Sequence, residues 1–369
     1  MKVRSLMRFA APAVAILLVV GCGRQSFSGS GLGNEGQVQA GNIVGGSAVA
    51  ASDFKHVVGL AKDGRIFCSG NLVESNKILT AGHCVTNFDI DTEAALQAIF
   101  EKTMDEVEKN LAGQDISLFN NAPLAAKRTL FKAALRRVIT DEGKSIKIYV
   151  GSSSVGGSET GLDVVADVAL SPGGYAYMEA SVLKYTNLAL PEDQAVKYSA
   201  SFDYAYMTLK TTLSGVTPVP VINAQEHSDN VLLGQDVRVV GFGLKVDGRF
   251  LRASRLIIKE LEEKIAAEQD EQKKQELQAQ LAEEKVMGQA FLALYFNSGN
   301  KNMVDLKLEN YDHTEITLTK KGSGLAGACN GDSGGPALVK LRNGEWRQLG
   351  VVVTVDYCGN KTHVSPRFR

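Results

Sequence analysis

The feature that most constrains this chain is the glycine-rich stretch GACNGDSGGPALV, which starts at Gly327 and places Ser333 near its centre. A serine hydroxyl is a useful nucleophile only when a base removes its proton and the resulting oxyanion is stabilised. The glycines permit a sharp turn that aims the N–H groups of Gly331 and Ser333 at one point. Asp332 between them would be costly to bury without a cationic partner. The stretch therefore predicts a histidine base, an orienting acid and a buried positive charge elsewhere in the chain.

The chain contains a candidate for each of these partners. His83 follows the apolar residues of KILTAGHCV, which are typical of the buried end of a strand that runs into a turn. Asp203 precedes the alternating, β-prone run of FDYAYMTLK, and nearby Asp193 is the alternative acid. The segment IVGG begins at Ile43, and the α-ammonium group that proteolysis would free there could pair with Asp332.

The order of these motifs resembles that of trypsin-like serine proteases of the chymotrypsin fold. The chain presents, in turn, IVGG, FCSGNLV, LTAGHC, FDYAYMTL, VRVVGFG and CNGDSGGP. The order His83, Asp203, Ser333 is that of the chymotrypsin-like enzymes. The nucleophile-elbow pattern G-x-S-x-G also fits around Ser333, but the histidine lies upstream and no strand-and-helix pattern follows, so we reject that interpretation. The resemblance implies an all-β fold of two six-stranded antiparallel β-barrels with helical insertions.

The resemblance also implies a role for each candidate residue. In a serine endopeptidase that works through an acyl-enzyme, Ser333 is the nucleophile, His83 is the general base and then the general acid, and Asp203 fixes the imidazole tautomer. Gly331 and Ser333 supply the oxyanion hole, and Ile43 and Asp332 form the activation pair. The alternative interpretation of IVGG is a simple glycine turn after a strand.

Five cysteines are present, namely Cys22, Cys68, Cys84, Cys329 and Cys358. The resemblance implies two disulfides, one joining Cys68 to Cys84 around the histidine loop and one joining Cys329 to Cys358 beside the specificity pocket. Four cysteines alone allow three pairings, so the spacing does not choose between them. Disulfides indicate an oxidising compartment.

The N-terminal residues 1–21 resemble a bacterial lipoprotein signal peptide. A basic start is followed by a short apolar run from Phe9 to Val20 and then by Cys22, which we expect to be lipidated. The alternative is an ordinary secretory signal with an incidental cysteine. Residues 22–42 are rich in Gly, Ser, Gln and Asn and predict a flexible tether. Gly23 after the cysteine favours the outer membrane or periplasm of a bacterial cell envelope.

Activation and release are linked in this interpretation. A cut before Ile43 would create the new N-terminus and also separate the protease from lipidated Cys22. The residue before the cut is Asn42, so we do not expect a trypsin-like enzyme to be the activating protease. The chain is thus predicted to be a membrane-tethered zymogen.

The remaining segment, residues 43–369, is the predicted protease domain, and it contains helical insertions at about 89–144 and 251–287. In the first insertion, helical spacing is shown by Ile99, Leu130, Phe131 and Leu135 among others. The second is dense in Glu, Lys, Gln and Ala, and its leucines keep no sustained heptad. We expect a solvated helix or hairpin on a monomer, which would restrict access of large substrates to the cleft. The alternative is an oligomerisation stalk.

Specificity is expected to depend on residues around the base of the S1 pocket. The position where a tryptic enzyme carries an aspartate is Gly327 here, followed by Ala328, so a preference for Lys or Arg is not expected. Val355, Asp356 and His363 are the candidate walls. We expect a small or medium neutral side chain in S1, and a basic side chain assisted by Asp356 is the alternative.

Composition excludes several other classes of function. A net charge of −1 argues against nucleic acid as a partner, and the histidines have no metal-ligand spacing. We expect no cofactor and no metal, with proteins or peptides as substrates. Two alternatives stay open. One is a catalytically silent homologue that acts as a binding lipoprotein, and the other is a structural envelope lipoprotein.

Overall fold

The computed structural model describes most of the chain after Gly45. The described residues are 46–50, 52–86, 93–111, 117–151, 161–184, 186–243, 248–294, 300–322, 326–355 and 361–367. The proposed signal peptide, lipidation site and tether lie outside them, as do Ile43, Asp356 and Cys358. The chain divides into two units, Met1–Gln37 and Val38–Arg369, and all the features described below belong to the second unit.

The first sheet has six antiparallel strands in the order β5-β2-β3-β4-β7-β6. Its strands are β2 (Val57–Lys62), β3 (Arg65–Glu74), β4 (Lys77–Thr80), β5 (Lys147–Tyr149), β6 (Val165–Leu170) and β7 (Ala205–Leu209). Reciprocal backbone hydrogen bonds between Ile148 of β5 and Leu162, just before β6, bring the two edges of the sheet together. The sheet therefore curls almost into a closed barrel.

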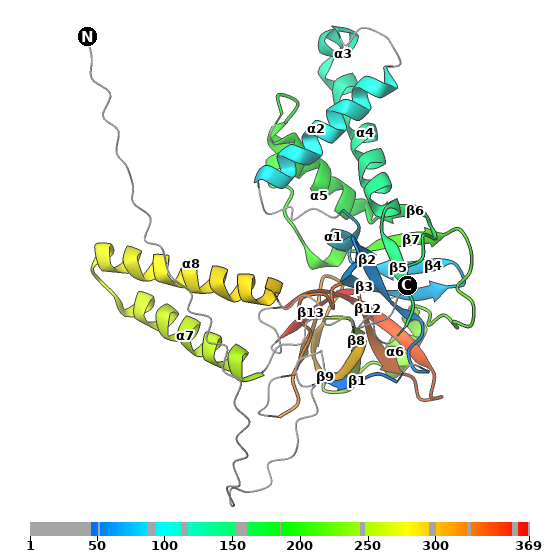
Figure 1. Cartoon of the computed structure of the whole chain (residues 1–369), viewed down its shortest axis with the longest axis vertical. Coiled ribbons are helices and arrows are strands. Elements are labelled where there is room, and N and C mark those ends of the chain that lie inside the picture. The colour runs from blue at the N-terminus through cyan, green and yellow to red at the C-terminus, as the bar shows by residue number, and fades with distance from the viewer. Residues whose placement is uncertain are drawn as a thin grey trace, which may run out of the picture. The chain divides into compact units, whose positions relative to one another are not determined.

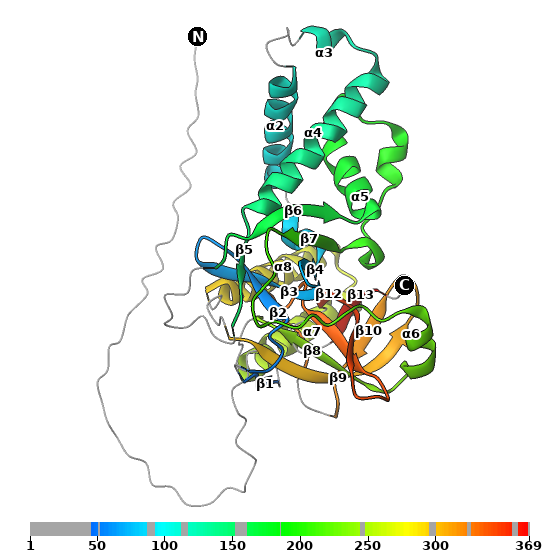
Figure 2. The ribbon, with the colours of Figure 1, turned by 90° about the vertical axis from the view of Figure 1, so that its right-hand side faces the viewer.

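The second sheet is a closed barrel with one added strand. Its order is β1-β9-β10-β13-β12-β11-β8, and the further pairing of β9 with β8 closes six of these strands into a ring. The strands are β1 (Ser47–Ala48), β8 (Asp236–Gly241), β9 (Asn302–Tyr311), β10 (Ile316–Thr319), β11 (Pro336–Lys340), β12 (Trp346–Val355) and β13 (Thr362–Pro366). Figures 1 and 2 show the two sheets beside one another. The prediction of an all-β fold with two six-stranded antiparallel barrels is confirmed.

Each sheet encloses an apolar core because its strands alternate inward and outward side chains. In β7 every second residue is buried, beginning with Ala205, and the same alternation runs along most of β9. Leu60, Ile78 and Leu79 are fully buried in the first core. Leu306 and Leu349 are fully buried in the second.

The first helical insertion packs against the first sheet. It contains α2 (Glu93–Asn110), α3 (Ser117–Asn121) and α4 (Leu124–Lys144). The apolar face of this helix pair buries Ile99, Phe131 and Leu135 completely, and the Phe100 and Phe131 rings lie 6.0 Å apart. Leu130, which sequence spacing placed on that face, is 42% exposed because it precedes Phe131 by one residue and so points elsewhere.

A further group of helices was not predicted from the sequence. α5 (Pro172–Leu183) lies beside α2 and α4 in Figures 1 and 2. It begins after Ser171, whose hydroxyl oxygen accepts a hydrogen bond from Gly174 N–H at 2.8 Å. The short helices that complete the set are α1 (Gly82–Thr86), η1 (Pro191–Ala195), η2 (Ala200–Phe202) and α6 (Ala224–Asn230).

The second insertion forms a helical hairpin. α7 (Gly248–Ala267) and α8 (Glu271–Leu294) lie side by side in Figure 1, and Lys285 of α8 forms an ion pair with Glu262 of α7 at 3.2 Å. Asp270 caps the start of α8 by accepting hydrogen bonds from the N–H groups of the second and third residues after it. Within the part of the chain that the structure describes, no helix is both long and apolar enough to cross a membrane.

Candidate active site

His83 and Asp203 are brought together by the pairing of β4 with β7. The antiparallel register places Thr80, near the end of β4, opposite Ala205, at the start of β7. His83 follows β4 by three residues and Asp203 precedes β7 by two, so both lie at the same end of this strand pair. The turn predicted at His83 is the short helix α1.

The Asp203 carboxylate holds His83 at two points. Oδ1 accepts a hydrogen bond from the His83 backbone N–H at 2.9 Å, and Oδ2 lies 2.8 Å from Nδ1 of the imidazole. An Nδ1–H donated to this carboxylate leaves the lone pair of a neutral imidazole on Nε2. This is the tautomer that a general base acting through Nε2 requires.

The surroundings of Asp203 keep it ionised. The residue is 6% exposed, and such burial alone would raise the pKa of its carboxyl group. Attraction to the His83 ring when it is protonated, the hydrogen bonds from that ring and the Tyr198 hydroxyl, and the His83 backbone N–H outweigh burial and lower that pKa. Tyr198 Oη donates to Oδ2 at 2.7 Å.

Asp193, the alternative acid, has a different partner. Its carboxylate receives two hydrogen bonds from the Arg128 guanidinium of α4, at 2.8 and 3.0 Å, and one from Leu190 N–H. Arg128 lowers the pKa of Asp193. Through this bidentate ion pair, Asp193 of η1 is joined to Arg128 of α4.

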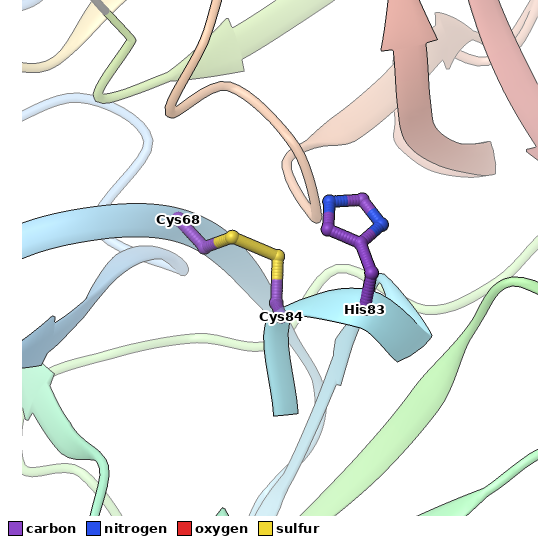
Figure 3. Close-up of side chains that lie close together, drawn as sticks. All are labelled: Cys68, His83 and Cys84. Carbon is purple, nitrogen blue, oxygen red and sulfur yellow. A yellow bond between two sulfur atoms is a disulfide. The ribbon is translucent and has the colours of Figure 1, made fainter. Parts of the chain in front are cut away.

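A disulfide joins Cys68 of β3 to Cys84 of α1, as the resemblance implied. Figure 3 shows it next to His83, which precedes Cys84 in the same short helix. The two sulfurs and the imidazole lie close enough together to suggest a metal site. Sulfurs bonded to one another offer no thiolate, however, and a thiolate is what a metal would need. Cys329 is also disulfide-bonded, and Cys358, its expected partner, lies outside the described residues.

The Ser333 loop is fastened to the same corner of the first sheet. The Ser333 carbonyl accepts a hydrogen bond from Ser69 N–H at 2.8 Å, and Ser69 Oγ donates to the Gly331 carbonyl, also at 2.8 Å. Cys84 Sγ lies 3.6 Å from the Ser333 carbonyl oxygen; since this sulfur is in a disulfide, the contact is van der Waals. The loop thus contacts the residue next to His83, and Ser333 itself is half-buried.

Two glycines give this loop its conformation. Gly331 has φ of 94° and Gly334 has φ of 83°, in the region that other residues avoid. A Cβ atom on Gly334 would lie 2.1 Å from both Ser69 O and Thr80 Oγ1. Only glycine fits at this point, which explains part of the GDSGG pattern in physical terms.

Asp332 is completely buried beneath the loop. Its two oxygens accept hydrogen bonds from Gly243 N–H at 2.7 Å and Cys329 N–H at 2.9 Å. Burial raises its pKa to about 7, although these two hydrogen bonds act in the opposite direction. Among the residues that the structure describes, no cation forms an ion pair with this carboxylate, and Ile43, its predicted partner, lies outside that set.

Four of the five predicted S1 residues are described. Gly327 and Ala328 are buried, and Ala328 N–H donates to Thr362 Oγ1 at 3.2 Å. The β12–β13 register sets Val355 opposite Thr362, directly before His363. These contacts bring together the three segments of the predicted pocket that contain Ala328, Val355 and His363. The His363 ring also contacts the Glu315 carboxylate, a pairing that the sequence did not predict.

Sequence reasoning also missed Tyr198 and Ser69. Tyr198 lies in a segment without a recognisable motif, and its role depends on the fold that brings it to Asp203. Ser69 belongs to the motif FCSGNLV, and its hydroxyl also accepts a hydrogen bond from Phe242 N–H at 2.9 Å. Its position in the motif could have drawn attention to it.

Comparisons with known proteins match part of the chain in sequence. The Trypsin family model matches residues 43–126, a stretch that includes His83 but neither Asp203 nor Ser333. The serine protease SP24D of Anopheles gambiae is 45% identical over 49 residues, and hypodermin-A of Hypoderma lineatum is 43% identical over 47 residues. Each match covers 13% of this chain and 18% of the relative.

Among solved structures, human heparin binding protein aligns with 88% of this chain and 91% of its own, at 13% identity and a TM-score of 0.44. Residues 43–126 thus resemble the trypsin family in sequence, and the described strands form the two antiparallel barrels expected from that resemblance.

Proposed function

We propose that this protein is a serine endopeptidase that uses Ser333, His83 and Asp203. The observation that carries the proposal is the contact of one buried carboxylate, that of Asp203, with both the backbone N–H and the Nδ1 of His83. A histidine held in this way is oriented for proton transfer at Nε2. The disulfide and the Ser69 hydrogen bonds support the proposal because they fasten the Ser333 loop to the histidine loop.

The reaction follows from these roles. Ser333 Oγ attacks the carbonyl carbon of the scissile peptide bond while its proton moves to His83 Nε2. The oxyanion formed is stabilised by the N–H groups of Gly331 and Ser333. The intermediate collapses, the C–N bond breaks, and His83 returns the proton to the leaving amine. Water then repeats the sequence on the acyl-enzyme and releases the acid.

Substrate preference is proposed from two parts of the site. At S1, Gly327 and Ala328 carry no charge, which supports a small or medium neutral side chain. A second, mostly apolar hollow lies beside the imidazole. Its lining includes His83, Leu170, Tyr177, Met178, Tyr198 and Phe202. An apolar substrate side chain next to the scissile bond would remove water from this surface.

Activation is proposed to occur by cleavage between Asn42 and Ile43. The buried carboxylate of Asp332 supports this, because it has no cationic partner among the described residues and an arriving α-ammonium would neutralise it. With Cys22 lipidated, the same cleavage would release the enzyme from the membrane of the bacterial envelope. Labelling of Cys22 with an alkynyl fatty acid tests the anchor, and a Cys22→Ser variant is its control. A labelled, active form in which Cys22 is still joined to Ile43 would overturn the release step.

Peptide hydrolysis tests the proposed function. The full chain is given a recognition sequence for a site-specific protease directly before Ile43, so that it can be cut there at will. We expect the cut protein to hydrolyse unfolded protein and short peptide esters. A Ser333→Ala variant, cut in the same way, should be at least about a thousandfold slower. A folded, cut wild-type protein with no more activity than this variant would favour the silent-homologue alternative.

A further inference from the structure

The Asp203 carboxylate has one hydrogen-bond donor that comes from the segment between η1 and η2, outside the sequence motifs. Tyr198 Oη donates to Oδ2 at 2.7 Å, and Oδ2 is the same oxygen that contacts His83 Nδ1 at 2.8 Å. Among the described residues, the other donor to this carboxylate is the His83 backbone N–H, on Oδ1. Oδ2 therefore has two hydrogen-bond partners, the Tyr198 hydroxyl and the His83 ring.

The tyrosine hydroxyl is suited to act as a permanent donor. Partial burial and the negative charge of Asp203 raise the pKa of Tyr198 well above its usual value, so the hydroxyl stays protonated at every pH at which a protease works. The charge of Asp203 and the hydrogen bond to it both favour the neutral phenol. The phenol can donate a hydrogen bond, and the carboxylate can only accept one. The other titratable groups that act on Tyr198 are Tyr177 of α5 and Glu315, before β10.

The position of Tyr198 is set by an aromatic cluster. The centroid of its ring lies 5.8 Å from that of Tyr177, edge to face, and 6.0 Å from that of Phe202. The Tyr177 and Phe202 centroids lie 6.1 Å apart. Tyr177 belongs to α5 and Phe202 to η2, directly before Asp203. Three rings that contact one another restrict the rotation of each.

The first insertion holds the segment that carries Tyr198. Arg128 of α4 binds both oxygens of Asp193 in η1 and also donates to the Leu188 carbonyl at 2.6 Å. The two ionised side chains are only 12% and 8% exposed. A line of contacts thus runs from α4 through η1 and Tyr198 to Asp203 and His83.

We propose that Tyr198, which lies between η1 and η2, is a positioning residue for the triad and holds Asp203 Oδ2 against the His83 imidazole. This inference rests on the proposed function. The tyrosine hydroxyl does not touch the reacting atoms and acts through Asp203, while the ring also lines the hollow beside the imidazole. With Tyr198 removed, Oδ2 loses one of its two hydrogen bonds and the carboxylate gains freedom to turn away from Nδ1.

The test is Tyr198→Phe in the full chain cut before Ile43. The phenylalanine ring retains the aromatic cluster, so the variant should fold with a melting temperature close to that of the wild type. We expect kcat for a short peptide ester to fall about tenfold, the size expected when a hydrogen bond to a charged group is lost, while KM stays within about twofold. Tyr175→Phe is the matched control, because it removes a hydroxyl from α5, outside both the Asp203 contacts and the hollow.

A second readout separates positioning from a general effect on structure. The low-field NMR resonance of the His83 Nδ1 proton reports the hydrogen bond to Asp203 and should move in Tyr198→Phe but not in Tyr175→Phe. An unchanged kcat and an unmoved resonance in folded Tyr198→Phe would overturn the inference and leave the proposed function intact. A wild-type protein with no activity would overturn the proposed function, and the resonance would still decide whether Tyr198 positions the pair.

Discussion

At the scale of single residues, the site depends on two buried carboxylates whose pKa values are shifted in opposite directions. Asp203 has hydrogen-bond donors on both oxygens and a histidine beside it, so burial does not prevent its ionisation. Asp332 is buried completely, receives two backbone N–H bonds, and still has a pKa raised to about 7. The first carboxylate is ready to orient a base, whereas the second needs a cation before it can be ionised at little cost.

This difference predicts how stability depends on pH before cleavage at Ile43. Folding raises the pKa of Asp332 from 3.8 to about 7, so between these values the folded protein binds a proton that the unfolded chain releases. The free energy of unfolding should therefore fall as pH rises through this range, by at most about 4 kcal/mol. Urea unfolding of the uncut full chain at pH 5 and pH 8 measures the change.

Asp332→Asn is the control for that prediction. The amide is neutral at both pH values, so the free energy of unfolding of the uncut variant should differ much less between pH 5 and pH 8. Cleavage before Ile43 should have a similar effect, since the new ammonium group lowers the cost of the ionised carboxylate. A pH dependence that is identical in the wild type and in Asp332→Asn would show that Asp332 does not carry it.

At the scale of secondary-structure elements, ion pairs join α4 of the first insertion to the neighbouring helices α5 and η1. Arg128 and Asp193 connect α4 to η1, and Lys132 and Arg136 of α4 both contact Glu179 of α5. Among these, the Arg128–Asp193 pair is the most buried and has fork geometry. Loss of one partner would leave the other charged and unpaired.

We predict that Arg128→Met destabilises the protein by about 3 kcal/mol, because it leaves Asp193 without its cation. Asp193→Asn should cost less, since the amide can still accept from Leu190 N–H. The double variant should cost less than the sum of the two single changes, and chemical unfolding of all four proteins measures the coupling. Additivity within about 0.5 kcal/mol would contradict a direct interaction.

The α7–α8 hairpin is predicted to behave differently. Most of its described side chains are exposed, including Leu256 at 61%, and α7 and α8 contact mainly each other. Replacement of Gly248–Leu294 by a short Gly-Ser linker should therefore change the melting temperature of the cut protein by only a few degrees. If the hairpin restricts the cleft, hydrolysis of folded protein should become faster while hydrolysis of short peptides stays the same.

Two results would speak against that role. Unchanged rates on both substrates would remove the access hypothesis. Concentration-dependent self-association of the wild type in sedimentation experiments, lost on deletion of the hairpin, would favour the oligomerisation stalk instead.

At the scale of the whole molecule, the sequence predicted most of the parts that depend on local motifs. The two-barrel fold came from the family resemblance that the order of the motifs carries. The Cys68–Cys84 bridge came from the resemblance. Tyr198 could not be predicted, because its contact with Asp203 depends on α5, η1 and α4 together. Helix α5 was missed since its short run, PGGYAYMEASVL, contains two glycines and shows little amphipathic pattern.

The central claim concerns the whole chain, since Ser333, His83 and Asp203 come from three distant segments. The most direct measurement is labelling with a fluorophosphonate serine probe, followed by mass spectrometry of the modified peptide. Three full-chain samples are compared: uncut, cut before Ile43, and cut Ser333→Ala. We predict that only the cut wild type is labelled, and that the adduct is on Ser333. Equal labelling of cut and uncut wild type would contradict activation at Ile43, and no labelling of folded, cut wild type would contradict the proposed protease itself.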